Sequence, residues 1–334
     1  MLMTARAETA VSPLAPWALR LALFALQVAV VGFALHRFAS LATPVAINVM
    51  LVAVFVALVG ALLAIASLKR IWVRGEGGAG RSTAALAIGI ALAMVPLAMI
   101  PRVMSSPGIN DITTDANVPP PIAAAATARG FGANAVDYPG ERYSLAQGAS
   151  YPEIMPIITN RSPSEVFDLA HDVVEKRGWE ILAERAPPGR GSSGTIEAVD
   201  YSFVFGFPDD VVLRISGSDG KARVDVRSAS RYGGHDLGRN AQRVKELIKE
   251  LQARIDASVR IADRESEAAE AEAEKIANEA AVAATAVKKS DFQARVNRRK
   301  KRDRARSDAR GGQVRKAKQR PKSADFPFDI APQR

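Results

Sequence analysis

Residues 45–68 form a run of 24 residues without one charged side chain, and this run constrains the chain more than any other feature. At a rise of about 1.5 Å per residue, a helix of this length crosses the roughly 30 Å hydrocarbon core of a bilayer. Two weaker apolar runs flank it in the sequence. We therefore predict a three-helix membrane anchor over residues 1–104, with spans at about 17–36, 45–68 and 82–101.

The first span is the weakest, because its uncharged centre covers only residues 21–35. Trp17 and Arg20 before this centre, and His36 and Arg37 after it, can lie at the interface and lengthen the span. The same stretch could instead be a secretory signal peptide. No span has an acidic or basic residue in its interior, which argues against a transporter.

The orientation of the anchor follows from its two short loops. Residues 69–81 contain four Lys or Arg against one acid, Glu76, whereas Arg37 is the only basic residue between the first two spans. Positive loops stay in the cytoplasm. We therefore predict a protein of the bacterial inner membrane whose residues 105–334 are periplasmic.

Basic charge is concentrated at the end of the chain. Residues 288–334 hold 17 Lys and Arg against 5 acids, a local +12, while the whole chain carries +10, so the residues before them sum to 10 − 12 = −2. This division excludes a simple soluble enzyme and a uniformly basic nucleic-acid-binding fold. Blocks of like charge are typical of disordered interaction tails. We predict a disordered basic tail at 288–334, after an Ala/Glu-rich helical stalk at 259–287.

The partners expected for the tail depend on orientation. A periplasmic tail would contact anionic lipid or an acidic envelope polymer, in addition to the bilayer that holds the spans. With inverted topology, nucleic acid would become the leading partner. The protein partners are left open by the sequence.

Residues 151–258 read as one folded domain. Ser162 and Glu165 form a capping box that opens an amphipathic helix, and Gly178 ends it. Short strands are predicted at 154–158, 179–183, 194–205, 211–215 and 222–226, with a Ser-Gly-Ser-Asp-Gly turn at 216–220 closing a hairpin. Asp236 can cap a last helix. The order β-α-β-β-β-β-α predicts an α+β sandwich with an antiparallel sheet.

Residues 105–150 are rich in Pro, Gly and Ala without any period, which predicts an extended linker. Within it, one polar motif could form Asx-turns or contribute oxygens to a polar site: Asp111, Thr113, Thr114 and Asp115.

Several of these motifs resemble one bacterial family. Asp209-Asp210-Val-Val-Leu-Arg-Ile, the stretch at 223–231, the stretch at 236–243 and the motif at 107–115 are similar to the family called domain of unknown function 1499. The resemblance covers about residues 105–255. It implies an envelope-associated domain, often preceded by membrane helices, and it implies no catalytic residues.

One polar cluster stands out as a candidate site. Its members are Asp209, Asp210, Arg227, Ser228, Ser230, Arg231, Asp236, Asn240 and Arg243. Three roles are open: an ion-pair network joining the hairpin to the last helix, an anion site built from Arg forks, or catalysis. Catalysis needs a nucleophile beside a base, and only His235 is near the two serines in sequence.

The absence of Cys excludes thiol nucleophiles, disulfides and Cys-bound metals, and the three His are far apart in sequence. We therefore expect no metal site and no cofactor. The leading hypothesis is a non-enzymatic membrane-anchored binding or structural module. The alternatives are an envelope hydrolase or transferase that uses the Arg/Asp/Ser cluster, and a nucleic-acid contact through the tail.

Overall fold

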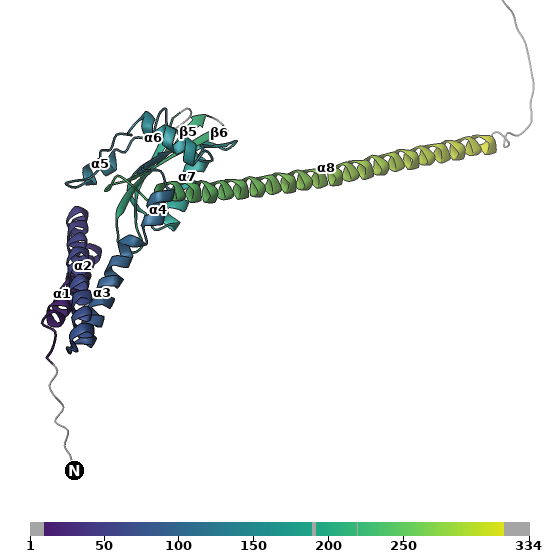
Figure 1. Ribbon diagram of the computed structural model, residues 1–334. Helices are drawn as coiled ribbons and strands as arrows, with labels where there is room; N and C mark the ends of the chain where they lie inside the picture. The colour runs from purple at the N-terminus through teal and green to yellow at the C-terminus, as the bar shows by residue number, and fades with distance from the viewer. Residues whose placement is uncertain (1–9, 189–191, 219, 317–334) are drawn as a thin grey trace, which may run out of the picture. The chain divides into compact units, whose positions relative to one another are not determined.

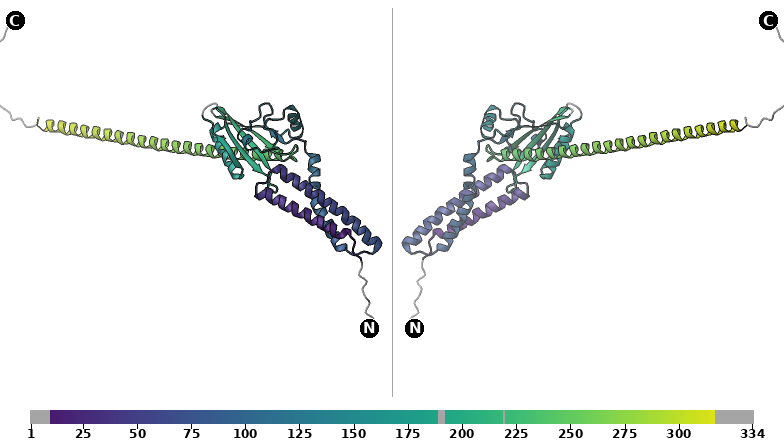
Figure 2. Two further views of the ribbon diagram at one scale, coloured as in Figure 1. Left: turned by 90° about the vertical axis from the view of Figure 1, so that its left-hand side faces the viewer. Right: turned by 90° about the vertical axis from the view of Figure 1, so that its right-hand side faces the viewer.

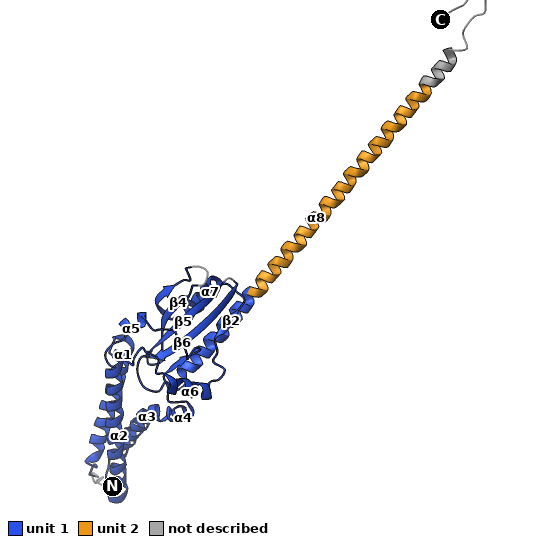
Figure 3. Ribbon diagram, turned by 90° about the horizontal axis from the view of Figure 1, so that it is seen from above, with its two compact units in different colours: residues 1–258 blue, residues 259–334 orange. Residues whose placement is uncertain are grey.

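The computed structural model of the protein describes residues 10–188, 192–218 and 220–316, with the side chains of the last helix described as far as residue 308. The chain forms two compact units, residues 1–258 and 259–334 (Figure 3). The first unit contains three apolar helices and a sheet domain, and the second contains most of one long helix (Figure 1).

The three predicted spans are confirmed as helices long and apolar enough to cross a membrane. They are α1 (Leu14–Phe38), α2 (Thr43–Arg74) and α3 (Ala79–Leu97), and a short α4 (Ile100–Ser105) continues the third span. Pro96 lies in the last turn of α3. Because proline lacks the N–H that a helix needs, Pro96 accounts for the break between α3 and α4.

Small residues hold the three spans together, side by side (Figure 2). The buried face of α1 consists of Ala and Gly only, and a Cβ added to Gly60 of α2 would lie 3.2 Å from the backbone nitrogen of Ala22. Such residues let helix backbones approach closely in a bilayer, where the hydrophobic effect does not drive helices together. Ser82 and Ser67 add a buried hydrogen bond of 2.9 Å between α3 and α2.

The sheet domain confirms the predicted α+β class. Its antiparallel sheet has six strands, namely β1 (Asp111–Thr113), β2 (Ile157–Thr159), β3 (Glu180–Arg185), β4 (Gly194–Tyr201), β5 (Pro208–Ser218) and β6 (Lys221–Ser230). The order is β1-β6-β5-β4-β3, and β2 also pairs with β6. The β5–β6 hairpin has the predicted position, and residue 219 of its turn lies outside the described residues.

Two helices cover one face of the sheet. The capping box of Ser162 and Glu165 is confirmed at the start of α7 (Pro163–Lys176). The apolar faces of α7 and of the first turns of α8 (Arg239–Lys316) pack on one set of alternating strand residues, including Val211, Leu213 and Ile215. We call this the helix face.

The opposite face is covered by the segment predicted to be an extended linker. Residues 105–150 contain β1 at the sheet edge together with α5 (Ala124–Ala128) and α6 (Glu141–Ser150). Ile122 and Ala125 are buried against Val212 and Ala229 of the sheet. The segment is therefore part of the domain, because its few apolar residues find partners on strand positions that its own irregular pattern does not reveal. We call this the linker face.

Two further boundaries differ from the sequence predictions. The strand predicted at 194–205 ends at Tyr201, because Ser202 and Phe207 close a hydrogen-bonded turn. The stalk and the start of the basic tail are one helix, since α8 continues through residues 288–316, where a disordered segment was predicted. Lys, Arg, Ala and Gln all have high helix propensity, so this basic sequence favours a helix despite its charge. The tail after residue 316 lies outside the described residues.

Candidate functional site

The nine residues of the predicted polar cluster do not meet at one place. Successive side chains of a strand point to opposite faces of a sheet. Asp209 pairs with Ser230, and Val211 with Ser228, on the helix face, whereas Asp210 pairs with Ala229, and Val212 with Arg227, on the linker face. The sheet therefore divides the cluster into two groups.

The helix-face group is centred on Arg243 of α8. Its guanidinium donates to Asp209 at 2.6 Å and to Asp200, which pairs with Asp209 across β4 and β5, at 2.7 Å. A third bond reaches the hydroxyl of Ser228 at 2.9 Å. One buried cation thus serves two carboxylates and a hydroxyl.

The two serines of the cluster belong to the same group. Ser228 donates to the Oδ1 of Asn240 at 2.8 Å, and the amide of Asn240 donates to Ser230 at 2.9 Å. Asn240 is fully buried, as is Ser228, and Ser230 is 8% exposed. Both hydroxyls are therefore held inside the domain by partners on α8.

The linker-face group contains the complementary arrangement. Asp210 receives Arg231 at 2.8 Å and Arg129 at 2.9 Å, so that one fully buried carboxylate serves two cations. Next to it, Arg227 holds Asp111 of the linker motif through two bonds of 3.1 and 2.8 Å. These bidentate contacts attach the 105–150 segment to β5 and β6.

The rest of the linker motif continues this attachment. Thr114 exchanges bonds with the backbone of Val226, and the backbone of Thr113 is bound by the side-chain amide of Gln147. Asp115 accepts from the backbone of Asn117 and Val118, as in an Asx-turn. Its other oxygen accepts from Arg214, which also binds Asp225.

Asp236 lies at the start of α8, where a helix cap was predicted. Its carboxylate accepts from the backbone N–H of Gly238 and of Asn240, each at 2.8 Å. Burial raises the pKa of Asp236, and these two bonds oppose the shift without cancelling it. The neighbouring His235 accepts from the backbone of Leu237 and lies 3.3 Å from the carbonyl of Val103, so its two ring nitrogens are engaged away from the serines.

Burial controls the proton affinity of the linker-face group as well. It raises the pKa of Asp111 although Arg227 opposes the shift. It also raises the pKa of Tyr138 to about 12, with the charge of Asp111 as a second cause. The phenol of Tyr138 therefore stays protonated at neutral pH and is not a general base there.

Sequence reasoning missed Arg129 and Asp200, the remaining partners of Asp210 and Arg243. Asp200 is separated from Asp209 by a turn of the β4–β5 hairpin, so strand alternation and register could have placed it beside Asp209. Arg129 lies in the irregular segment, 81 positions from Asp210, and no local pattern indicates this pairing.

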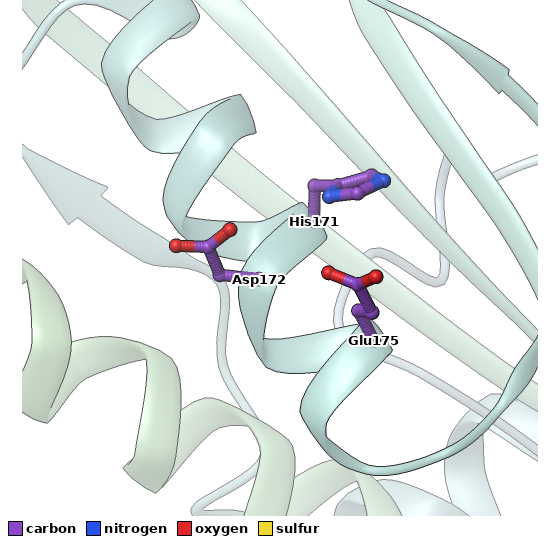
Figure 4. A group of neighbouring side chains, drawn as sticks. All are labelled: His171, Asp172 and Glu175. Carbon is purple, nitrogen blue, oxygen red and sulfur yellow. The ribbon is translucent and has the colours of Figure 1, made fainter.

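A second group of polar residues was not predicted. His171, Asp172 and Glu175 of α7 can bring one ligand atom each within 4.8 Å of one another (Figure 4). The spacing i, i+1 and i+4 on one helix could have revealed this group. His171 is half-buried, Asp172 and Glu175 are exposed, and the Nε2 of His171 is already 3.1 Å from Glu184 of β3. A surface ion pair accounts for the arrangement.

Two hollows on the described part of the chain contain none of the nine cluster residues. One, of about 350 Å³, lies between α1 and α2 and is lined mainly by apolar side chains. The other, of about 390 Å³, lies along the exposed part of α8. The polar groups on the two faces of the sheet thus line neither hollow.

Comparison with known proteins adds one finding. No curated protein matches the chain. The matching family model begins at the β1 strand and ends in the part of α8 that packs on the sheet, so it covers the linker motif and both polar groups. Residues 111–251 match the family described as protein of unknown function (DUF1499), the family that the sequence motifs predicted.

Proposed function

We propose that the protein is a membrane-anchored, non-enzymatic module that holds its sheet domain on the periplasmic side of the bacterial inner membrane. The observation that carries this proposal is the state of the polar cluster. Each Arg of the cluster is paired with at least one carboxylate, and both serines are bound by Asn240. The residues that would form a site instead join the parts of the domain.

The alternative of a hydrolase or transferase requires an accessible nucleophile activated by a base. Ser228 meets neither requirement, since it is fully buried and its bonds go to Asn240 and Arg243. An anion site requires guanidinium groups free to accept a ligand. Arg227 and Arg243 are each committed to two or more partners.

A serine-reactive fluorophosphonate probe tests the enzymatic alternative. We expect no labelling of the full chain in detergent micelles. Labelling that disappears in Ser228→Ala or Ser230→Ala, but persists in the exposed control Ser164→Ala, would contradict a non-enzymatic role.

The orientation rests on the loop between α2 and α3. In the structure Glu76 pairs with Arg70 at 2.9 Å, while Arg74 is largely exposed. The excess of positive charge therefore remains in this loop, as the positive-inside rule requires of a cytoplasmic segment.

A phosphatase reporter, which is active only in the periplasm, tests the orientation. We expect activity when it is fused after Ile255 and none when it is fused after Gly77. A cytoplasmic fluorescent reporter should give the reverse pattern at the same two positions. The opposite result would invert the topology and make nucleic acid the expected partner of the basic segment.

The basic part of α8 favours a second role, a contact with an anionic surface such as anionic lipid or an acidic envelope polymer. Residues 288–308 carry ten Lys or Arg against three acids, and their side chains are exposed except for the partly buried Val296. Each basic residue near an anionic membrane contributes about 1 kcal/mol, and salt screens the attraction over about 10 Å at 0.1 M.

Co-sedimentation tests this contact with the full chain held in nanodiscs of neutral lipid. We expect anionic vesicles to bind at low salt and to be released at high salt, and neutral vesicles not to bind. Replacing the five residues at 298–302 with Gln should abolish binding, whereas the charge-preserving control Lys300→Arg with Lys301→Arg should not. Binding that survives the Gln substitutions would contradict the proposal.

A further inference from the structure

The loop between β4 and β5 has an unusual composition for a hairpin connection. Phe203, Phe205 and Phe207 lie in this loop, and Tyr201 ends β4, so four of the seven residues at 201–207 are aromatic, against 6% for the whole chain. Such a concentration on an exposed connection needs an explanation, because apolar side chains in a loop normally find a partner.

Two of these aromatic rings pack on the first membrane span. Phe205 meets Phe33 of α1 edge to face, with ring centroids 6.0 Å apart, and Phe207 meets His36 at 5.4 Å. The two loop rings also stack on each other at 5.5 Å. The approach is close, because a Cβ added to Gly206 would lie 3.3 Å from the Cδ of Arg37.

These contacts fix the depth of the loop relative to the bilayer. His36 and Arg37 lie at the end of the span, where polar side chains belong at the interface. Phe33 is almost one helical turn further into the span, about 5 Å along the axis. A ring that touches Phe33 therefore lies at the boundary between headgroups and hydrocarbon.

The remaining apolar side chains of the loop have no protein partner of this kind. Phe203 is 89% exposed and Val204 is 56% exposed, next to the rings that contact α1. A loop at this depth is surrounded by lipid on the sides that protein does not cover. Phe is well suited to this position, because its ring is apolar and it has no group to hydrogen-bond.

The backbone of the loop is suited to lipid as well. Ser202 donates its N–H to the carbonyl of Phe207 at 2.9 Å, and Gly206 donates to the carbonyl of Ser202 at 2.8 Å. Phe207 donates to the hydroxyl of Ser202 at 2.9 Å. Backbone groups near hydrocarbon must be satisfied internally, and this turn satisfies three N–H groups itself.

A second segment reaches the end of the next span. A Cβ added to Gly132 would lie 3.3 Å from the Cγ of Pro44 in the first turn of α2. The preceding residue, Phe131, is 97% exposed. The C-terminal end of α1 and the N-terminal end of α2 are joined by a short loop, so both segments lie at the same side of the bilayer.

We propose that Phe131, Phe203 and Val204 form a membrane-contacting rim that seats the sheet domain on the lipid surface of the bilayer its own helices span. The partner is the interfacial layer of the lipid, and the attraction is apolar. The rim therefore fixes the orientation of the domain on the membrane, which a single connection through α4 would leave free. This inference goes beyond the anchoring role and does not depend on the direction of insertion.

The absence of Cys in the chain makes the rim directly testable. Single-Cys variants Phe203→Cys and Phe131→Cys, labelled with an environment-sensitive fluorophore, are reconstituted in vesicles of neutral phosphatidylcholine. The control is Ile158→Cys, whose position is 72% exposed on β2. β2 pairs with residues 222–224 of β6, at the opposite end of the sheet from the loop.

We expect lipids with a spin label high on the acyl chain to quench the fluorophore at 203 and 131 at least twofold more than at 158. Iodide in the water should show the reverse preference. Equal iodide access at 203 and 158 would overturn the proposal. Protection from iodide without quenching by lipid would also overturn it, because that result identifies a protein, such as a second copy, as the cover.

Discussion

The two faces of the sheet use the same ion-pair chemistry with opposite stoichiometry. On the helix face, one guanidinium, that of Arg243, lies between Asp200 and Asp209. On the linker face, one carboxylate, that of Asp210, lies between Arg129 and Arg231. The central residue is therefore a cation on the helix face and an anion on the linker face, although Arg243 and Asp210 belong to one predicted cluster in the sequence.

This difference matters because a buried charge is costly only when it has lost its partner. Removing Arg243 would leave the buried Asp209 and the partly buried Asp200 to repel each other, whereas removing Arg231 would leave Asp210 with Arg129. Four substitutions test this comparison, and we describe them from the largest expected effect to the smallest.

Arg243→Met should have the largest effect on stability. It keeps much of the volume of the side chain and leaves Asp200 and Asp209 without their shared cation, which costs about 3–5 kcal/mol for a buried pair. Chemical unfolding of the full chain in micelles measures this loss, with Trp17 and Trp72 replaced by Phe so that the buried Trp179 reports on the domain.

The matched control for Arg243→Met is Arg239→Met. Arg239 also faces Asp200, but at 3.7 Å and with its side chain 48% exposed. Its loss should cost no more than about 1 kcal/mol, as for other exposed pairs. Similar losses for the two variants would contradict the central role of Arg243.

Asp210→Asn should have the next largest effect. The amide keeps one acceptor oxygen but leaves two buried guanidinium groups without a counter-charge, and hydrogen bonds to charged groups contribute about 1.5–3 kcal/mol each. The same unfolding assay measures the change. The exposed control Asp168→Asn should leave the midpoint unchanged, and a neutral result for Asp210→Asn would mean that Arg129 and Arg231 are stabilised by other contacts.

Arg231→Met should be milder than either change above. Asp210 retains Arg129, so we expect a loss of about 1.5–3 kcal/mol, the contribution of one hydrogen bond to a charged group. The ratio of the losses in unfolding free energy for Arg231→Met and Arg243→Met directly measures the difference between the two faces of the sheet. A loss for Arg231→Met as large as for Arg243→Met would show that two cations on one carboxylate give no redundancy.

Asp236→Asn should have the smallest effect on stability, and the size of this effect depends on pH. Burial raises the folded-state pKa of Asp236 above its ordinary value of 3.8. A raised pKa gives stability that is fully present below 3.8 and is lost as pH rises through the folded pKa. The unfolding free energy of the wild type, relative to that of Asp236→Asn, should therefore fall as the pH rises from 3.8 to the folded-state pKa. Above the folded-state pKa the difference should no longer change with pH. If the difference in unfolding free energy between the wild type and Asp236→Asn rose with pH, the raised folded-state pKa of Asp236 would be contradicted.

The sequence predicted much of the fold because its signals are local. Charge-free length indicated the three spans, and the capping box of Ser162 and Glu165 located the start of α7. Strand alternation together with the turn at 216–220 indicated the β5–β6 hairpin. Each signal depends on residues within one element, so a single sequence contains it in full.

The candidate site was less predictable. The nine polar residues were predicted from the sequence as one cluster. Neighbours such as Asp209 and Asp210 are adjacent in sequence and point to opposite faces of the sheet. Distant residues supply further partners of the cluster: Asp200 for Arg243, Arg129 for Asp210 and Asp111 for Arg227. The role of the segment at 105–150 was missed for the same reason, since its contacts are non-local.

By itself, the sequence determined what depends on composition and on short-range order: three apolar spans, an α+β domain whose residues 111–251 match the DUF1499 family, and a basic final segment. The tertiary structure decided which charged side chains form ion pairs with one another. Pairing across a sheet depends on register and on the face toward which each side chain points, and both are set by the packing of distant segments. For this reason Arg243 and Asp210, which the sequence places in one cluster, are the centres of two separate groups.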